Sequence, residues 1–124
     1  MYLCIENEFT QFYFMKKYIL DLVVTQNIKL HANYVLIKLT HANPLPEMLP
    51  GQFAEIRIDG SNTTFLRRPI SINYVDKTTN EVWFLVQLVG DGTRKLATVK
   101  QGDFVNVVMP LGIGFTMPRF VSKL

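Results

Sequence analysis

Cysteine is almost absent from the sequence, because Cys4 is the only one among 124 residues. One thiol cannot form an internal disulfide, and it cannot supply the set of ligands that an iron–sulfur cluster or a structural zinc site needs. The two histidines, His31 and His41, lack the spacing of a metal site. The composition therefore predicts a chain of a reducing compartment, the cytoplasm, without a metal site of its own.

Long apolar runs and a strong charge of one sign are also missing. No apolar stretch approaches the roughly 20 residues of a membrane-spanning helix, and no positive charge opens the chain as it would a secretory signal. The formal net charge is only +3, without a lysine- and arginine-rich run or a basic stripe interleaved with aromatics. These absences argue against membrane, secreted and nucleic-acid-binding proteins.

Hydrophobic residues make up 48% of the chain, which is enough for one domain with its own core. Residues 93–100 alone have helical character, for about two turns, with Thr93 as the expected N-cap. Short alternating or β-rich runs, separated by turn residues, recur at residues 18–24, 34–41, 52–58, 69–75, 81–89 and 104–110. These six strand-like runs predict an antiparallel barrel or sandwich with one short helix.

The stretch Arg67-Arg68-Pro69-Ile70-Ser71 is the first candidate site. Pro69 restricts the preceding residue to extended geometry, so that Arg68 leaves the backbone in a defined direction. A guanidinium beside a polar strand face suits a phosphate joined to a flat heterocycle. The alternative is an edge strand with solvated arginines. Because side chains alternate along a strand, we expect Pro69, Ser71 and Asn73 on one face and Ile70, Ile72 and Tyr74 on the other.

The stretch Gly90-Asp91-Gly92-Thr93, just before the expected helix, is the second candidate. Its glycines let the backbone approach a ligand closely, and free N–H groups at a helix start bind anions. The Asp91 carboxylate would repel phosphate unless it points outward. The alternative is an ordinary turn followed by a capped helix.

Two further glycine-containing stretches have simpler interpretations. Residues 49–53 (LPGQF) read as a turn into a strand, and residues 109–115 (MPLGIGF) as a loop that leaves the barrel. Trp83 and Met109 are interpreted as core residues.

Taken in order, the segments PGQF, RRPIS, GDGT with LATVKQGD, and PLGIGF resemble the flavin-binding domain of the ferredoxin-reductase-like superfamily. More narrowly, they resemble the electron transfer subunit family of NAD-linked dihydroorotate dehydrogenase. The resemblance covers about residues 15–116 and implies a six-stranded antiparallel Greek-key barrel that binds FAD.

The resemblance also implies a role for individual residues. Arg68 would hold the FAD pyrophosphate, to which Gly92 and Thr93 would donate, and Arg67 would serve packing or charge. Val86 and Gln87 depart from the family, which usually has an aromatic and a basic residue there. The cofactor-binding set implied is Arg68 at the pyrophosphate, Pro69, Ile70 and Ser71 against the flavin, Leu85, Val86 and Gln87 along the ring and the ribityl–adenine side, with Gly92 and Thr93.

The resemblance implies a function in pyrimidine biosynthesis. Electrons from dihydroorotate would pass from an FMN-containing catalytic subunit, through a [2Fe–2S] cluster and FAD, to NAD. The family continues into a nucleotide-binding domain and a cysteine cluster, and this sequence holds neither. We therefore expect a fragment or shortened homologue that binds FAD but does not reduce NAD efficiently by itself.

The expected organisation has three parts: an extension of unknown role (1–14), either a leader or an arm over a sheet edge, the FAD-binding barrel (15–116) and a tail (117–124). Loss of a covering domain would favour a homodimer. Two other readings stay open, namely another ferredoxin-reductase-like flavin oxidoreductase and a cofactor-free binding barrel.

Overall fold

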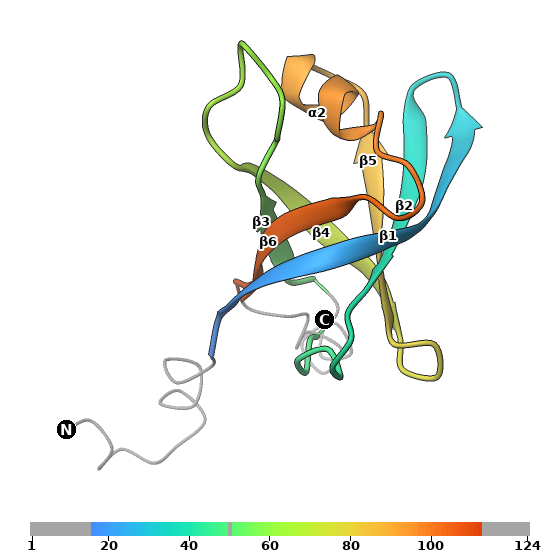
Figure 1. The fold of residues 1–124 in the computed structure, drawn as a ribbon, viewed down its shortest axis with the longest axis vertical. Helices are drawn as coiled ribbons and strands as arrows, with labels where there is room; N and C mark the ends of the chain where they lie inside the picture. The colour runs from blue at the N-terminus through green and yellow to red at the C-terminus, as the bar shows by residue number, and fades with distance from the viewer. Residues whose placement is uncertain (1–15, 50, 113–124) are drawn as a thin grey trace, which may run out of the picture.

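The computed structural model describes residues 16–49 and 51–112, in which six antiparallel strands close into a barrel (Figure 1). The strand order is β1-β2-β5-β4-β3-β6. Because β3, β4 and β5 are consecutive and β6 returns beside β3, the topology is a Greek key. The predicted fold class is confirmed. The elements are β1 (Tyr18–His31), β2 (Tyr34–Thr40), β3 (Phe53–Ile56), β4 (Arg68–Asp76), β5 (Glu81–Gln87), α2 (Asp91–Leu96) and β6 (Phe104–Leu111).

Alternation of apolar and polar residues explains why these segments form a barrel. On β2, Val35, Ile37 and Leu39 are buried, and their neighbours are less so. On β3, Ala54 and Ile56 are likewise buried. Inward-facing aliphatic side chains fill a small barrel completely, so the fold offers a binding site outside its core rather than within it.

The first strand is longer than predicted. It continues past Val24 to His31, and register shifts fall between Val24 and Gln26 and again between Lys29 and His31. Residues 18–23 pair with β6, and residues 23–31 pair with β2. The polar residues after Val24 hide this continuation, because a strand that bends between two neighbours loses its simple alternation.

Two aromatic residues lie on the outer surface against expectation: Tyr74, expected on the same face as Ile70 and Ile72, and Trp83, interpreted as a core residue. The register of β4 shifts between Ile72 and Tyr74, so that Tyr74 turns outward after the inward-facing Ile72. Its ring packs against Trp83 with centroids 4.8 Å apart, and Lys38 Nζ lies 4.0 Å from the Trp83 ring centre. Trp83 is therefore not a core residue, whereas Met109 is fully buried as predicted.

Helix α2 begins two residues earlier than expected, with Gly90 rather than Thr93 as its N-cap, and it ends at Leu96. Asn27 of β1 fixes its far end by donating hydrogen bonds to the carbonyls of Ala97 (2.9 Å) and Val99 (2.8 Å). Figure 1 shows α2 beside the loop before β4 at one end of the barrel, with the β4–β5 turn at the opposite end.

Some predictions concern parts of the chain outside the described residues. These are the extension 1–14, the end of the MPLGIGF segment after Gly112 and the tail 117–124. In the part that is described, no helix has the length and apolar character needed to cross a bilayer.

Candidate functional site

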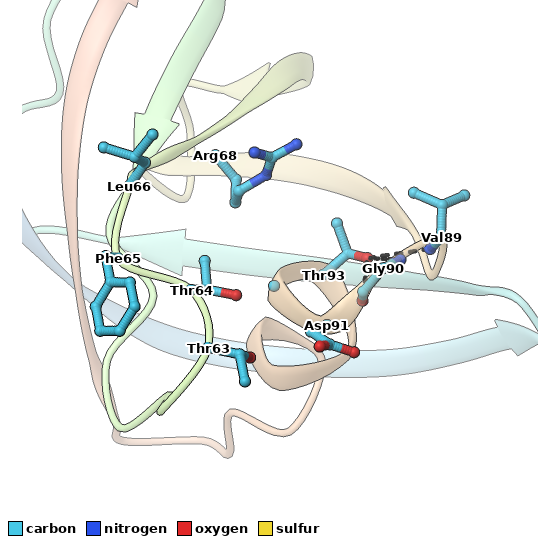
Figure 2. A pocket seen from close by; sticks show the side chains of 10 residues that line it. Thr63, Thr64, Phe65, Leu66, Arg68, Val89, Gly90, Asp91 and Thr93 are labelled. Atoms are coloured by element: carbon cyan, nitrogen blue, oxygen red, sulfur yellow. Dashed lines mark hydrogen bonds between the residues drawn. The ribbon is translucent and has the colours of Figure 1, made fainter.

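A cleft with a volume of about 430 Å³ opens where α2 meets the loop before β4 (Figure 2). It is lined by residues 63–66, Arg68 and residues 89–93. The fold thus brings together the two candidate stretches that the sequence singled out, although they are far apart along the chain. Arg68, Gly92 and Thr93 of the predicted set lie in this one cleft.

Gly92 is the point of closest contact between the two stretches. A Cβ atom at this position would lie 3.2 Å from Arg68 Cγ, 3.2 Å from Thr64 Cγ2 and 3.3 Å from Arg68 Cδ. These distances are shorter than ordinary van der Waals contacts. The absence of a side chain at Gly92 therefore lets the aliphatic stem of Arg68 lie directly on the first turn of α2.

The guanidinium of Arg68 is an unneutralised positive charge at the cleft. Among the residues that the structure describes, the ion pairs are Arg57–Asp59 and Lys77–Glu47, and none involves Arg68. Asp91 lies on the helix side of the cleft and Arg68 on the strand side (Figure 2). An exposed guanidinium without an internal partner is well suited to bind an anionic group of a ligand.

Thr93 shapes the turn that precedes α2. Its Oγ1 accepts hydrogen bonds from the N–H groups of Val89 (3.0 Å) and Gly90 (3.1 Å) and donates to the Gly90 carbonyl (3.0 Å). The hydroxyl is thus engaged within the turn. The donors that α2 can offer to a ligand are main-chain N–H groups of residues 91–93, since the first N–H groups of a helix have no acceptor within it.

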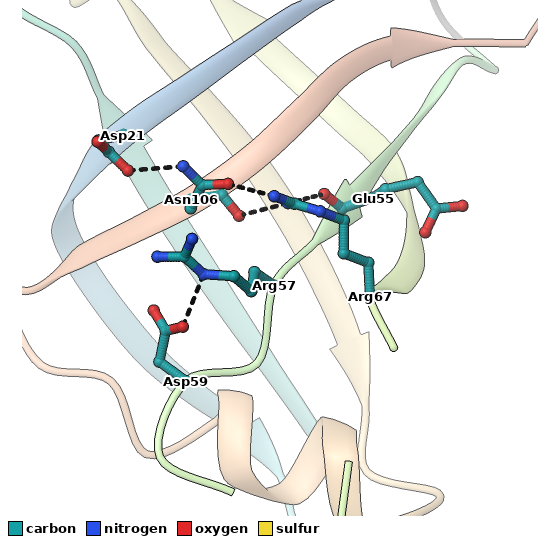
Figure 3. Close-up of polar contacts among 6 residues, drawn as sticks. All are labelled: Asp21, Glu55, Arg57, Asp59, Arg67 and Asn106. Atoms are coloured by element: carbon teal, nitrogen blue, oxygen red, sulfur yellow. Dashed lines mark hydrogen bonds and ion pairs between the residues drawn. The ribbon is translucent and has the colours of Figure 1, made fainter. Parts of the chain in front are cut away.

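Arg67 has a structural role, in line with the packing role expected of it. One terminal nitrogen, Nη1, donates to the carbonyls of Glu55 and Asn106, at 3.2 Å each, and Nη2 donates to the Asn106 side chain (Figure 3). Asn106 in turn donates to Asp21 Oδ1 at 2.8 Å. Arg67 therefore links β3, β6 and β1 on the outer surface of the barrel.

The outer face of β4 carries the polar residues that the sequence predicted. Pro69, Ser71 and Asn73 are exposed, and no described residue hydrogen-bonds to the Ser71 hydroxyl. Ile72 pairs with Phe84, so the next positions toward the cleft are Ser71 on β4 and Leu85 on β5. These side chains make a surface that continues from Arg68 along the strand.

The remaining predicted residues divide between surface and core. Leu85 and Gln87 point outward from β5, next to the β4 face. Ile70 and Val86 are buried in the barrel. Only the main chain of these last two residues can reach a ligand on the outside.

Sequence reasoning missed the loop residues 63–66 and Val89, which complete the cleft. The apolar residues among them are Phe65 and Leu66, just before the two arginines, and Val89, just after β5. Their closeness in the sequence to the two candidate stretches was the only indication that they belong to the cleft. The sequence analysis also missed that the buried side chain of Gln52 connects the LPGQF segment to Gly112. The Gln52 side chain accepts from the N–H of Leu49 (2.7 Å) and donates to the carbonyl of Gly112 (3.0 Å).

Titratable side chains outside the cleft do not meet the requirements of a metal site in the part of the chain that the structure describes. Within residues 16–49 and 51–112, no group of three or more His, Cys, Asp or Glu side chains could hold a metal ion. At the β4–β5 turn, a hydrogen bond from the Thr78 hydroxyl lowers the pKa of Asp76 below its ordinary value. That turn lies at the opposite end of the barrel from the cleft.

The barrel is shared with modular reductases of known structure. A cytochrome P450 reductase of Amycolatopsis matches with a TM-score of 0.68 and 24% identity, covering 78% of this chain and 29% of that one. Phthalate dioxygenase reductase, described as a modular structure for electron transfer from pyridine nucleotides to [2Fe–2S], matches with 0.66 and 20%, covering 77% and 30%. At these identities the likeness shows the fold alone. No family model matches the chain.

Curated proteins give a narrower match, and each is named dihydroorotate dehydrogenase B (NAD(+)), electron transfer subunit. The Fusobacterium nucleatum protein is 35% identical over 95 residues, which are 77% of this chain and 37% of that protein. The Lysinibacillus sphaericus protein is 43% identical over 75 residues, or 60% and 29%. The resemblance predicted from the motifs is confirmed. The chain spans about a third of the length of these relatives.

Proposed function

We propose that this chain is the FAD-binding domain of an electron transfer subunit of NAD-linked dihydroorotate dehydrogenase. The observation that carries the proposal is the packing of Arg68 on Gly92 at the mouth of the cleft. This packing places the unpaired guanidinium of Arg68 beside the first main-chain N–H groups of α2. A guanidinium and the N–H groups at a helix start are both suited to bind the negative charges of a pyrophosphate. The similarity to electron transfer subunits supports the same cofactor class.

The described residues fit FAD in three respects. Arg68 and the main-chain N–H groups of residues 91–93 would hold the pyrophosphate. The exposed face of Pro69 and Ser71 would support the flavin ring, with Leu85 and Gln87 beside it. The Ser71 hydroxyl, which has no partner among the described residues, is free to hydrogen-bond to the ring. Thr93 would act through the turn that its hydroxyl holds.

When bound, FAD supplies a redox carrier between the oxidation of dihydroorotate and the reduction of NAD. The protein's part is to orient the ring and neutralise the phosphates. We propose as partner an FMN-containing catalytic subunit, in the cytoplasm. The [2Fe–2S] cluster of the family is not assigned to this sequence, because one Cys cannot supply four thiolates.

Retention of flavin tests the cofactor assignment. The purified chain is incubated with FAD and desalted, its visible absorption spectrum is recorded, and the released flavin is identified by chromatography. We expect a retained flavin that is FAD, with bands that shift in a Ser71→Ala variant because a hydrogen bond to the ring is lost. A well-folded but colourless protein would contradict the proposal and favour a cofactor-free barrel.

Co-elution tests the partner assignment. The FAD-loaded chain is mixed with a dihydroorotate dehydrogenase catalytic subunit and separated by size. A joint peak supports the proposal. Separate elution of a chain that keeps its FAD would instead favour another flavin oxidoreductase of the same fold.

A further inference from the structure

The outer face of β1, β6 and the end of β3 carries charged and exposed apolar side chains in register. Asp21 of β1 pairs with Asn106 of β6, and the N–H of Arg57, just after β3, donates to the Asn106 carbonyl at 3.0 Å. These three residues form one row across the face, with Asn106 in the middle. Two residues from that row, on opposite sides of it, lie Phe104, 68% exposed, and Ile19, 71% exposed. We refer to these five residues as the β6 face.

The β6 face separates charges of opposite sign. The Asn106 amide donates to Asp21 Oδ1 at 2.8 Å and accepts from Arg67 Nη2 on its other side (Figure 3). Arg57 Nε donates to Asp59 Oδ1 at 2.8 Å, and Figure 3 shows the Arg57 guanidinium between Asp59 and Asn106. No ion pair among the described residues involves Asp21. A carboxylate thus lies on the β1 side of Asn106, and two guanidinium groups lie on the β3 side.

This order of charges is self-complementary about β6. Two copies that stack these faces around a twofold axis parallel to β6 place β1 of one copy over β3 of the other. Asp21 of each copy then meets Arg57 and Arg67 of the other, so that the same attractive contact forms twice. An axis across the strands would instead place Asp21 on Asp21, and like charges at close range repel each other.

Phe104 lies on β6 itself and therefore beside that axis. Its ring would meet the same ring of the second copy, and an aromatic pair gains from its contact geometry as well as from burial. Aromatic residues and arginine are also the residue types enriched at protein interfaces. None of the five residues of the β6 face lines the cleft at Arg68. Contact through this face therefore leaves the cleft open.

We propose that the β6 face binds a second copy of this chain, and that the twofold axis of the dimer runs along β6. The inference goes beyond the proposed function, because neither FAD nor the catalytic subunit takes part in the contact. Three strands of a small barrel offer a modest contact area, so monomer and dimer exchange with concentration. Because the charges on this face are exposed, salt weakens the association.

Sedimentation velocity of the full chain over a range of concentrations tests the inference. We expect the wild type to shift from monomer to dimer as the concentration rises, and to shift back when salt is added. Phe104→Ala should weaken dimerisation about tenfold or more, as the loss of a central aromatic contact does. Phe65→Ala is the matched control, since Phe65 is 85% exposed but lies at the cleft.

An exchange of charges tests how the two copies are oriented. Asp21→Arg places like charges opposite Arg57 and Arg67, and Arg57→Asp places them opposite Asp21, so each should weaken dimerisation about tenfold or more. The double variant Asp21→Arg/Arg57→Asp restores an opposite pair across the interface and should dimerise more tightly than either single variant. Both side chains are exposed, so the barrel stays folded.

Three outcomes would count against the inference. A wild type that stays monomeric at every concentration overturns it, and if Phe104→Ala then weakens binding to the catalytic subunit, the face serves that partner instead. A dimer that is weakened by Phe65→Ala and not by Phe104→Ala would place the contact at the cleft and overturn the β6 face. A double variant that dimerises no more tightly than the single variants would contradict the axis along β6.

Discussion

The two adjacent arginines, Arg67 and Arg68, have separate roles because their side chains take different directions where the loop leads into β4 (Arg68–Asp76). The Arg67 guanidinium donates hydrogen bonds to the carbonyls of Glu55 and Asn106 on the outer surface. Arg68 lies at the cleft without a partner among the described residues. One residue of the pair therefore stabilises the barrel, and its neighbour is available to a ligand.

This division predicts different effects for the two arginines on stability. Arg67→Ala leaves acceptors on Glu55 and Asn106 without their donor, and should lower the free energy of unfolding by about 1–3 kcal/mol. Arg68→Ala, an exposed position, should change it by less than about 0.5 kcal/mol. Urea unfolding of both variants measures this. Similar losses in the two would contradict the assignment of Arg67 as the structural residue.

A methyl group at Gly92 is predicted to disturb the site more than the fold. In Gly92→Ala the new Cβ displaces the Arg68 stem, which is flexible, so stability falls little. FAD affinity should drop about tenfold, as expected when a charge-assisted hydrogen bond is weakened. Unchanged FAD affinity in Gly92→Ala would refute the role of the Gly92 contact.

At the scale of elements, the sequence allowed the strands to be predicted better than their bends. Alternation marks inward positions such as Val35, Ile37 and Leu39, and these locate β2 directly. The bulge before Tyr74 and the continuation of β1 past Val24 depend on pairing with other strands, which no local pattern records.

The same limit applies to the candidate site. Arg68 and Gly92 could be predicted from their motifs, since a guanidinium before proline and a glycine at a helix start each have a local signature. The loop residues 63–66 could not be predicted, because only the fold brings them against α2. Nor does a motif show that the Thr93 hydroxyl is used inside its own turn.

The short helix α2 is predicted to depend on Asn27 of β1. Asn27→Ala removes two hydrogen bonds to the carbonyls of Ala97 and Val99, which should lower stability by about 1–2 kcal/mol. The loss should appear as faster amide hydrogen exchange in α2 than in β2. Asn33→Ala, at the β1–β2 turn, is the control. Unchanged exchange in α2 would show that Leu96 packing alone holds the helix.

At the scale of the whole molecule, closure of the barrel leaves its core filled and moves binding to the outside. The cleft lies where α2 and the loop before β4 meet at one end, and the polar face of β4 leads away from it. This arrangement gives one continuous surface for a long ligand. A cofactor that binds only the native chain would also raise the stability of the folded state.

The proposed contact between Arg68 and the pyrophosphate of FAD is tested by the FAD dissociation constant, measured by flavin fluorescence titration. We expect one FAD per wild-type chain and at least tenfold weaker binding in Arg68→Ala, the order of one charge-assisted hydrogen bond. Arg57→Ala, which removes another exposed arginine, should leave the constant unchanged. Absence of saturable FAD binding, or equal affinity in wild type and Arg68→Ala, would show that Arg68 does not hold the pyrophosphate.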